Sequence, residues 1–225
     1  SSQLDIAHDK FREMPFNKNI QNVQFINSFS SIPKYVDLCI ISATADLKLT
    51  VLKNFLSNCE TENMVFEKVV FQNPDDFRKA QEIFSSHNIQ AWVNCNRRLS
   101  SGYIQLKKLF TTKQKISFEV KGGKWGMASN AILYIDLFAF FTELYDYDLD
   151  ISGLDRIIHE SKQEGFVDFT GTLKGSFSDD NMFHLISENN KDINVSVTIS
   201  TQDTSATIEE NKGLVRLTKN NEQLD

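Results

Sequence analysis

A few charged residues stand where they could take part in chemistry. Glu67 and Lys68 follow one apolar run, Arg97 and Arg98 follow another, and Asp136 lies inside a long apolar stretch. A lysine whose pKa is lowered by burial can hold a substrate oxygen and pass it a proton. The residues alone also allow roles without chemistry: Glu67–Lys68 as an exposed pair, Arg97–Arg98 as a solvated pair, and Asp136 as a cap or ion-pair partner.

The elements around these residues decide whether they can meet. Strand-like runs alternate with segments of helical spacing, and the predicted order is a strand at 36–44, a helix at 47–56, a strand at 64–66, a helix at 74–84 and a strand at 90–94. Such alternation favours a parallel sheet with right-handed crossovers. Ligands of these sheets bind outside the carboxyl ends of the strands, which places a candidate site at 43–44, 67–68 and 94–98.

The second half of the chain predicts a different architecture. It begins with a short helix at 104–110, a strand at 116–120 broken by Gly122–Gly123, and a buried helix at 131–144. Segments of alternating hydrophobicity follow near 167–169, 195–199 and 214–217. Alternation of this kind indicates an antiparallel-rich sheet. We therefore predict an α/β chain in which an incomplete Rossmann-like parallel-sheet domain, 1–99, precedes an α+β domain with a largely antiparallel open sheet, 100–225.

Composition excludes several classes of protein. The net charge of −6 argues against a nucleic-acid partner, which would require a basic face. Neither a signal peptide nor an apolar run near the roughly 20 residues of a membrane span is present. Three widely spaced cysteines without CxxC and four scattered histidines indicate neither disulfides nor a metal site, and a cytoplasmic setting fits.

Glycine is absent before Gly102. A dinucleotide fingerprint or a Walker loop needs glycines after the first strand, so that the backbone can approach a phosphate. The sequence also has no HExxH metal motif and no GxSxG nucleophile motif.

Four stretches, in order, resemble the Gfo/Idh/MocA oxidoreductase family. Val36–Thr44 is similar to a family strand ending in Ala-Thr-Pro, and Val65–Lys68 to its Glu-Lys-Pro strand end. The third stretch, residues 93–98 with Tyr103, resembles the family's crossing into its second domain. The fourth stretch runs from Gly122 to Leu137 and resembles the family's glycine-rich turn followed by an Ile-Asp-Leu helix. The likeness extends from about residue 36 to 175, and more loosely to the end.

The resemblance implies a cofactor and a reaction. Members of the family oxidise or reduce sugars, inositols and sugar derivatives with NAD or NADP. Ala43 and Thr44 would line the cofactor cleft, and Glu67 and Lys68 would lie near the nicotinamide, with Lys68 as proton donor or acceptor. Asp9, after a possible strand at 4–7, would match the acidic residue that meets the ribose.

The resemblance also implies a substrate pocket and a partner. The residues expected to bind a small sugar-type substrate are Asn94, Arg98, Tyr103, Trp125 and Asn130, with Asp136 as a second catalytic residue. The sheet of the second domain would pair identical subunits into an oligomer.

Departures from the family pattern limit the resemblance. The first strand and the GxGxxG loop have no counterpart, which we interpret as an incomplete N-terminus. Ala45 and Val69 replace prolines, Leu133 replaces the usual histidine, and Ser129 replaces an acidic residue. A missing start explains the absent loop but not Leu133, which cannot exchange a proton. Three hypotheses follow: an oxidoreductase, a non-catalytic protein of the same fold that binds a sugar-like ligand or a partner subunit, and an α/β domain with an unrelated ligand.

Overall fold

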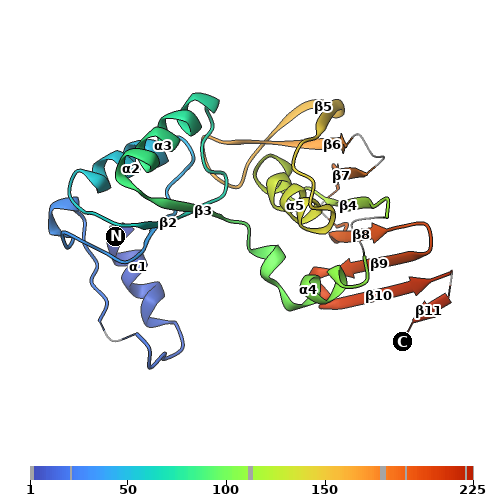
Figure 1. Cartoon of the computed structure of the whole chain (residues 1–225), viewed down its shortest axis with the longest axis horizontal. Coiled ribbons are helices and arrows are strands. Elements are labelled where there is room, and N and C mark those ends of the chain that lie inside the picture. The colour runs from blue at the N-terminus through green and yellow to red at the C-terminus, as the bar shows by residue number, and fades with distance from the viewer. Residues whose placement is uncertain are drawn as a thin grey trace. The chain divides into compact units, whose positions relative to one another are not determined.

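The chain is organised into two compact units, each with its own hydrophobic core. The computed structural model describes residues 3–20, 22–110, 114–177, 181–190, 192–220 and 222–224. Unit 1 comprises residues 1–94 and unit 2 comprises residues 95–225 (Figure 1).

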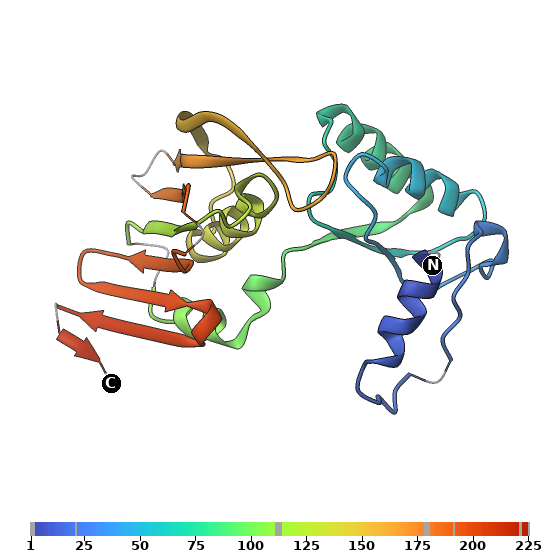
Figure 2. The same ribbon diagram turned by 180° about the vertical axis from the view of Figure 1, so that it is seen from behind.

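Unit 1 contains a three-stranded parallel sheet of order β1-β2-β3. Its elements are α1 (Gln3–Arg12), η1 (Phe29–Ser31), β1 (Cys39–Ile41), α2 (Lys48–Leu56), β2 (Asn63–Glu67), α3 (Pro74–His87) and β3 (Gln90–Asn94). Helices α2 and α3 lie on one side of the sheet and α1 lies on the other, as the opposite view in Figure 2 also shows. This strand–helix alternation is the predicted one.

Periodicity in the sequence explains the core of unit 1. In β2, Met64 and Phe66 are buried and alternate with half-exposed neighbours, as period-two side chains on a covered sheet do. Leu52 and Phe55 form the buried stripe of α2. Helix α3 starts as predicted: the Asn73 side chain accepts a hydrogen bond from the Asp75 amide at 2.9 Å, and proline occupies the first helical position.

The start of the chain differs from the prediction. The possible strand at 4–7 is wrong, because these residues lie in helix α1, which buries none of its side chains. Asp5 in its first turn and two basic residues in its last turn suit the helix dipole. The strand predicted at 36–44 is confirmed only at its centre, Cys39–Ile41.

Unit 2 contains an eight-stranded mixed sheet of order β11-β10-β9-β8-β4-β7-β6-β5. Strands β4 and β7 pair in parallel, and the other neighbours pair antiparallel. Its elements are η2 (Asn96–Leu99), α4 (Ser101–Lys107), β4 (Ser117–Gly123), α5 (Met127–Thr142), β5 (Asp148–Glu160), β6 (Val167–Ser176), β7 (Met182–Glu188), β8 (Ser196–Ser200), β9 (Thr204–Glu209), η3 (Glu210–Lys212), β10 (Leu214–Lys219) and β11 (Glu222–Leu224).

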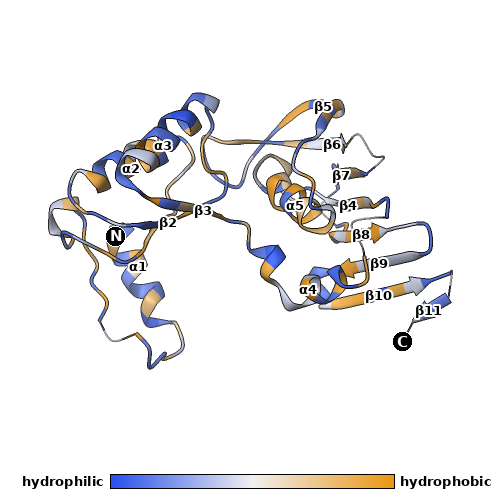
Figure 3. Cartoon of the chain, in the orientation of Figure 1, coloured by the Kyte–Doolittle hydropathy of each residue, from blue (hydrophilic) through white to orange (hydrophobic). Residues whose placement is uncertain are grey.

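Helix α5 is the centre of the second core. Figure 3 shows it as a largely hydrophobic helix against the sheet. Phe138 is fully buried, with its ring centroid 5.3 to 5.7 Å from those of Phe118, Phe177 and Phe183. Aromatic pairs at these separations add to the stabilisation from buried area.

The glycine pair in β4 does not break the strand, contrary to the prediction. Strand β4 continues through Gly123, paired with β7. A Cβ on Gly123 would lie 1.5 Å from the Asn190 carbonyl oxygen, and one on Gly122 would lie 2.9 Å from the Cα of Val195. These glycines therefore allow a close approach of two backbone segments.

The predicted fold class is confirmed: a parallel-sheet α/β unit is followed by an α+β unit with a largely antiparallel sheet. All three cysteines are free thiols. Among the described residues, no helix has the length and apolar character needed to cross a bilayer.

Candidate functional site

In unit 1, the carboxyl ends of the parallel strands bring predicted site residues together. Glu67 ends β2 opposite Asn94, which ends β3. The Asn94 side-chain amide donates a hydrogen bond to Glu67 Oε1 at 2.6 Å, which holds the carboxylate in one direction. Ala43 and Thr44 follow β1 at the same edge, and the Thr44 carbonyl accepts the hydrogen bond that starts the turn into α2.

Lys68, the expected proton donor, follows directly after β2 and is half-buried. The peptide bond between Lys68 and Val69 is cis. The segment is held from α2, because Lys48 Nζ donates a hydrogen bond to the Val69 carbonyl at 2.7 Å.

Lys48 is a buried cation that the sequence analysis missed. Its side chain is 2% exposed. Burial lowers the Lys48 pKa and the charge of Lys68 lowers it further, while Glu67 and Asp46 oppose the shift. A signal for this residue exists in the sequence, since Lys48 stands four residues before Leu52 on the stripe that α2 buries.

In unit 2, Arg98 and Asp136 form a tight ion pair. Arg98 Nε donates to Asp136 Oδ2 at 2.7 Å, and Nη2 donates both to Oδ1 and to the Asp136 main-chain carbonyl, the latter at 3.1 Å. The hydrogen bond with Asp136 raises the Arg98 pKa despite partial burial. The pair links η2 to the middle of α5, which agrees with the ion-pair interpretation of Asp136.

The Arg98–Asp136 pair leads to a stability prediction. Asp136→Ala leaves the guanidinium without its carboxylate, and we expect the free energy of unfolding to fall by about 1–3 kcal/mol. The loss is smaller than at a fully buried pair because the side chains are 31% and 20% exposed. Urea unfolding measures it.

The matched control is Arg78→Ala, which breaks the exposed ion pair with Asp75 on α3. We expect a loss below about 1 kcal/mol there. Equal losses in the two variants would contradict a structural role for the Arg98–Asp136 pair.

Arg97 lies at the centre of a second network in unit 2. Its Nε and Nη2 donate to the two Glu210 carboxylate oxygens at 3.0 and 3.2 Å, and Nη2 also donates to the Tyr134 hydroxyl at 3.1 Å. The guanidinium lies 4.3 Å from the centre of the Tyr134 ring. The Tyr103 hydroxyl donates to Glu210 Oε1 at 2.9 Å.

Burial fixes the protonation states in this network. It raises the Tyr134 pKa to about 12, although Arg97 opposes the shift. Burial, followed by the charge of Glu210, raises the Tyr103 pKa well above its usual range. Burial is the largest single influence on the Arg97 pKa and acts to lower it, but the hydrogen bond with Glu210 and the charges of Glu210 and the two tyrosines together raise the pKa above its ordinary value. Both phenols therefore keep their protons at neutral pH and serve as neutral hydrogen-bonding groups.

Three members of this network, Arg97, Tyr103 and Glu210, border a cavity of about 630 Å³ within unit 2. Asn130 and Leu133 contribute from α5 and Tyr103 contributes from α4. Trp125 lies beside Tyr134 at a ring-centroid distance of 5.3 Å, and its main-chain carbonyl accepts a hydrogen bond from the Asn130 amide at 2.8 Å. Leu133, which the resemblance to the family matches with a histidine, forms part of the apolar wall.

Most predicted site residues thus fall into two groups. Ala43, Thr44, Glu67, Lys68 and Asn94 lie at the strand ends of unit 1, and Arg98, Tyr103, Trp125, Asn130 and Asp136 lie around α5 in unit 2. Asp9 stands apart, exposed on helix α1. The sequence analysis missed Lys48, Tyr134 and Glu210; for Glu210, 113 residues after Arg97, no local pattern signals the contact.

Solved structures resemble the whole described fold. No family model and no curated protein matches the sequence. A dehydrogenase (MviM) from Clostridium difficile superposes with a TM-score of 0.67 at 14% identity, covering 98% of this chain and 69% of its own. A super-repressor mutant of Gal80p from Saccharomyces cerevisiae gives 0.67 at 12% identity, covering 100% and 68%. The chain therefore has a Gfo/Idh/MocA-like fold.

A third structure of this fold has a named substrate. The UDP-N-acetylglucosamine 3-dehydrogenase GnnA from Acidithiobacillus ferrooxidans gives a TM-score of 0.62 at 12% identity, covering 84% of this chain and 64% of its own. Proteins that share the fold therefore include named dehydrogenases as well as a super-repressor mutant.

Proposed function

We propose that this chain is part of an NAD(P)-dependent oxidoreductase that acts on a CH–OH group of a sugar or sugar derivative. The observation that carries the proposal is the placement of Lys68, Glu67 and Asn94 at the carboxyl ends of parallel strands, where such sheets bind their ligands. The dehydrogenases that share the fold support it.

The strand-end residues fit the redox end of a nicotinamide cofactor. Thr44 offers a hydroxyl, and Glu67 presents a carboxylate fixed by Asn94. The pyrophosphate would need a glycine-rich turn, and glycine is absent before Gly102 in this sequence. When bound, the nicotinamide accepts or supplies the hydride.

Lys68 carries the proton in this proposal. In the oxidative direction its neutral amine takes the proton from the substrate hydroxyl as the carbon gives up its hydride and the C=O bond forms. In the reductive direction its ammonium returns that proton to the carbonyl oxygen. A lysine suits both directions when its surroundings lower its pKa toward neutrality. Asp136 contributes through Arg98, which it holds in place.

Lys48 provides a prediction about this segment. Lys48→Met removes the donor to the Val69 carbonyl, so the turn that carries Lys68 loses its anchor. We expect turnover to fall about tenfold or more with KM nearly unchanged, because small displacements of a reacting group are costly. Steady-state kinetics of the full-length protein measure both quantities.

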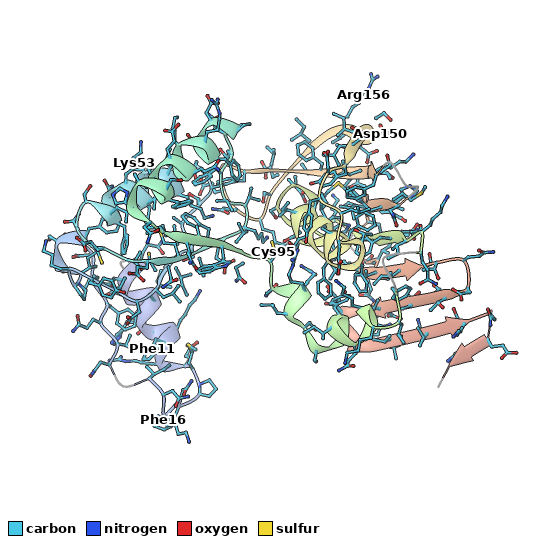
Figure 4. All side chains as sticks on the ribbon, in the orientation of Figure 1. Phe11, Phe16, Lys53, Cys95, Asp150 and Arg156 are labelled. Carbon is cyan, nitrogen blue, oxygen red and sulfur yellow. The ribbon has the colours of Figure 1, made fainter. Side chains whose placement is uncertain are left out.

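Two variants make the Lys48 test specific. Lys48→Arg retains charge and donors and should restore part of the rate. Lys53→Met, on the exposed face of the same helix (Figure 4), should behave as wild type. An unchanged rate in Lys48→Met would contradict the anchoring role.

A non-catalytic protein of the same fold is the second candidate. The observation that favours it is Leu133, an apolar and buried residue where the family has a proton-transferring histidine. Such a protein would bind a sugar-like ligand or a partner subunit without turning anything over.

An oligomer formed through the sheet of unit 2 is also part of the proposal. On the sheet face opposite the core, Glu119, Thr198 and Thr207 stand on three adjacent strands and are half-exposed. A polar surface of this kind can pair with a copy of itself. Light scattering after size exclusion gives the number of subunits, and a monomer would refute this point.

The deciding experiment for the function is cofactor titration followed by turnover. We expect NADH or NADPH to bind the full-length protein, and at least one sugar of a panel to be oxidised or reduced. Binding without turnover would favour the second candidate, and absence of nicotinamide binding would refute the first.

A further inference from the structure

The cavity of unit 2 holds one charge of each sign. Of the described residues that line it, Arg97 and Glu210 are charged. They are 22% and 27% exposed and meet through two hydrogen bonds at 3.0 and 3.2 Å. The cavity therefore has no net charge to offer a ligand, although it contains an arginine.

Both charges are held in place by neutral partners. The Tyr103 hydroxyl donates to Glu210, and the Tyr134 hydroxyl accepts from Arg97. The Tyr134 ring also lies against the guanidinium. A carboxylate or phosphate entering the cavity would have to displace Glu210 from Arg97 or lie next to it, and like charges at such separations repel strongly where water is partly excluded.

The rest of the lining suits a ligand with hydroxyl groups on an apolar ring. The walls are aliphatic, formed by Leu106, Leu133, Ile208 and Val215. Asn96, Ser100 and Asn130 stand among them with side chains that both donate and accept hydrogen bonds. The volume of about 630 Å³ lies within the range of small-molecule sites.

We propose that this cavity binds an uncharged polyhydroxylated ligand, and that the Arg97–Glu210 pair excludes acidic ones. Glu210 is then a specificity-determining residue, because it cancels the charge that would otherwise attract an anion. The inference rests on the proposed function only in taking this ligand to be the substrate.

The test compares three ligands of one ring size by calorimetry on the whole chain: methyl glucoside, glucuronate and, at pH 6, glucosamine. Wild type should bind methyl glucoside at least tenfold more tightly than glucuronate. In Glu210→Gln the uncompensated Arg97 should raise glucuronate affinity at least tenfold, with methyl glucoside changed by about threefold or less. In Arg97→Gln the uncompensated Glu210 carboxylate should instead raise the affinity for glucosamine, a cation at pH 6, at least tenfold.

A matched control stands next to Glu210 in the sequence. Glu209 pairs with Lys212 and Arg216 and is not part of the cavity lining, so Glu209→Gln should keep the wild-type order of affinities. Thermal unfolding shows whether each variant is folded. If Glu210→Gln does not fold, Arg97→Gln and the wild-type order still test the idea.

Three results would overturn the inference: glucuronate bound by wild type as tightly as methyl glucoside, no binding of any of the three ligands, or folded charge variants with the wild-type order. These measurements need neither nicotinamide nor turnover. If the protein binds the three ligands in the expected order of affinity but shows no redox activity, the proposed function is refuted and the inference stands. If it is an active enzyme that prefers acidic sugars, the inference is refuted and the proposed function stands.

Discussion

Lys68→Ala should lower turnover by about 10²–10⁴-fold, the range that a positioned acid or base supplies. Lys68 is half-buried at the end of β2, and the Lys48 contact holds the segment that carries it. We expect nicotinamide affinity to stay within about twofold, because Ala43, Thr44 and Glu67 remain in place. Turnover with the best sugar, together with fluorescence titration of the reduced cofactor, checks both parts.

The control for Lys68→Ala must remove a lysine without touching the strand ends. Lys53→Ala on α2 does so, and it should keep full activity. Activity retained in Lys68→Ala would remove Lys68 from the mechanism. A parallel loss of cofactor affinity would assign it to binding instead.

Phe138→Ala should cost unit 2 about 3–5 kcal/mol of unfolding free energy. The ring is completely buried and contacts three other phenylalanines, so its removal leaves a cavity that β-strands on one side and α5 on the other cannot close. Denaturant unfolding followed by near-ultraviolet circular dichroism measures the loss.

Phe16→Ala is the matched control for Phe138→Ala. Phe16 is 92% exposed in the loop beyond α1 (Figure 4), and we expect a change within about 0.5 kcal/mol. A loss below about 1 kcal/mol in Phe138→Ala would mean that the aromatic core of unit 2 repacks, contrary to the close ring contacts.

Local periodicity was sufficient to predict most of unit 1. Its strands and helices alternate, each strand pairs with the next one along the chain, and the Asn73–Pro74 start of α3 follows from side-chain chemistry. Helix α1 is missed because the run 4–7 is too short to show a helical period. Its half-buried residues, Leu4, His8 and Phe11, recur at helical spacing, and the rings of His8 and Phe11 contact Phe25. Short apolar runs of this kind do not distinguish helix from strand.

Pairing in unit 2 could not be predicted in the same way. Strands β7 and β8 are consecutive, but they lie on opposite sides of β4, which precedes both by more than fifty residues. The Arg97–Glu210 contact depends on this arrangement, so the network was invisible to motif analysis. The strand-end residues Glu67 and Asn94, by contrast, were expected together because parallel strands end at one edge.

The position of β4 between later strands has a consequence for how the protein is made. A ribosome releases Ser117 long before its partners Met182 and Ser200. One edge of this strand therefore stays unpaired through the synthesis of about 65 residues and the other through about 80, while the strands of unit 1 can pair as they emerge. Exposed strand edges invite association between nascent chains. Slower elongation or chaperone depletion should accordingly aggregate unit 2 before unit 1.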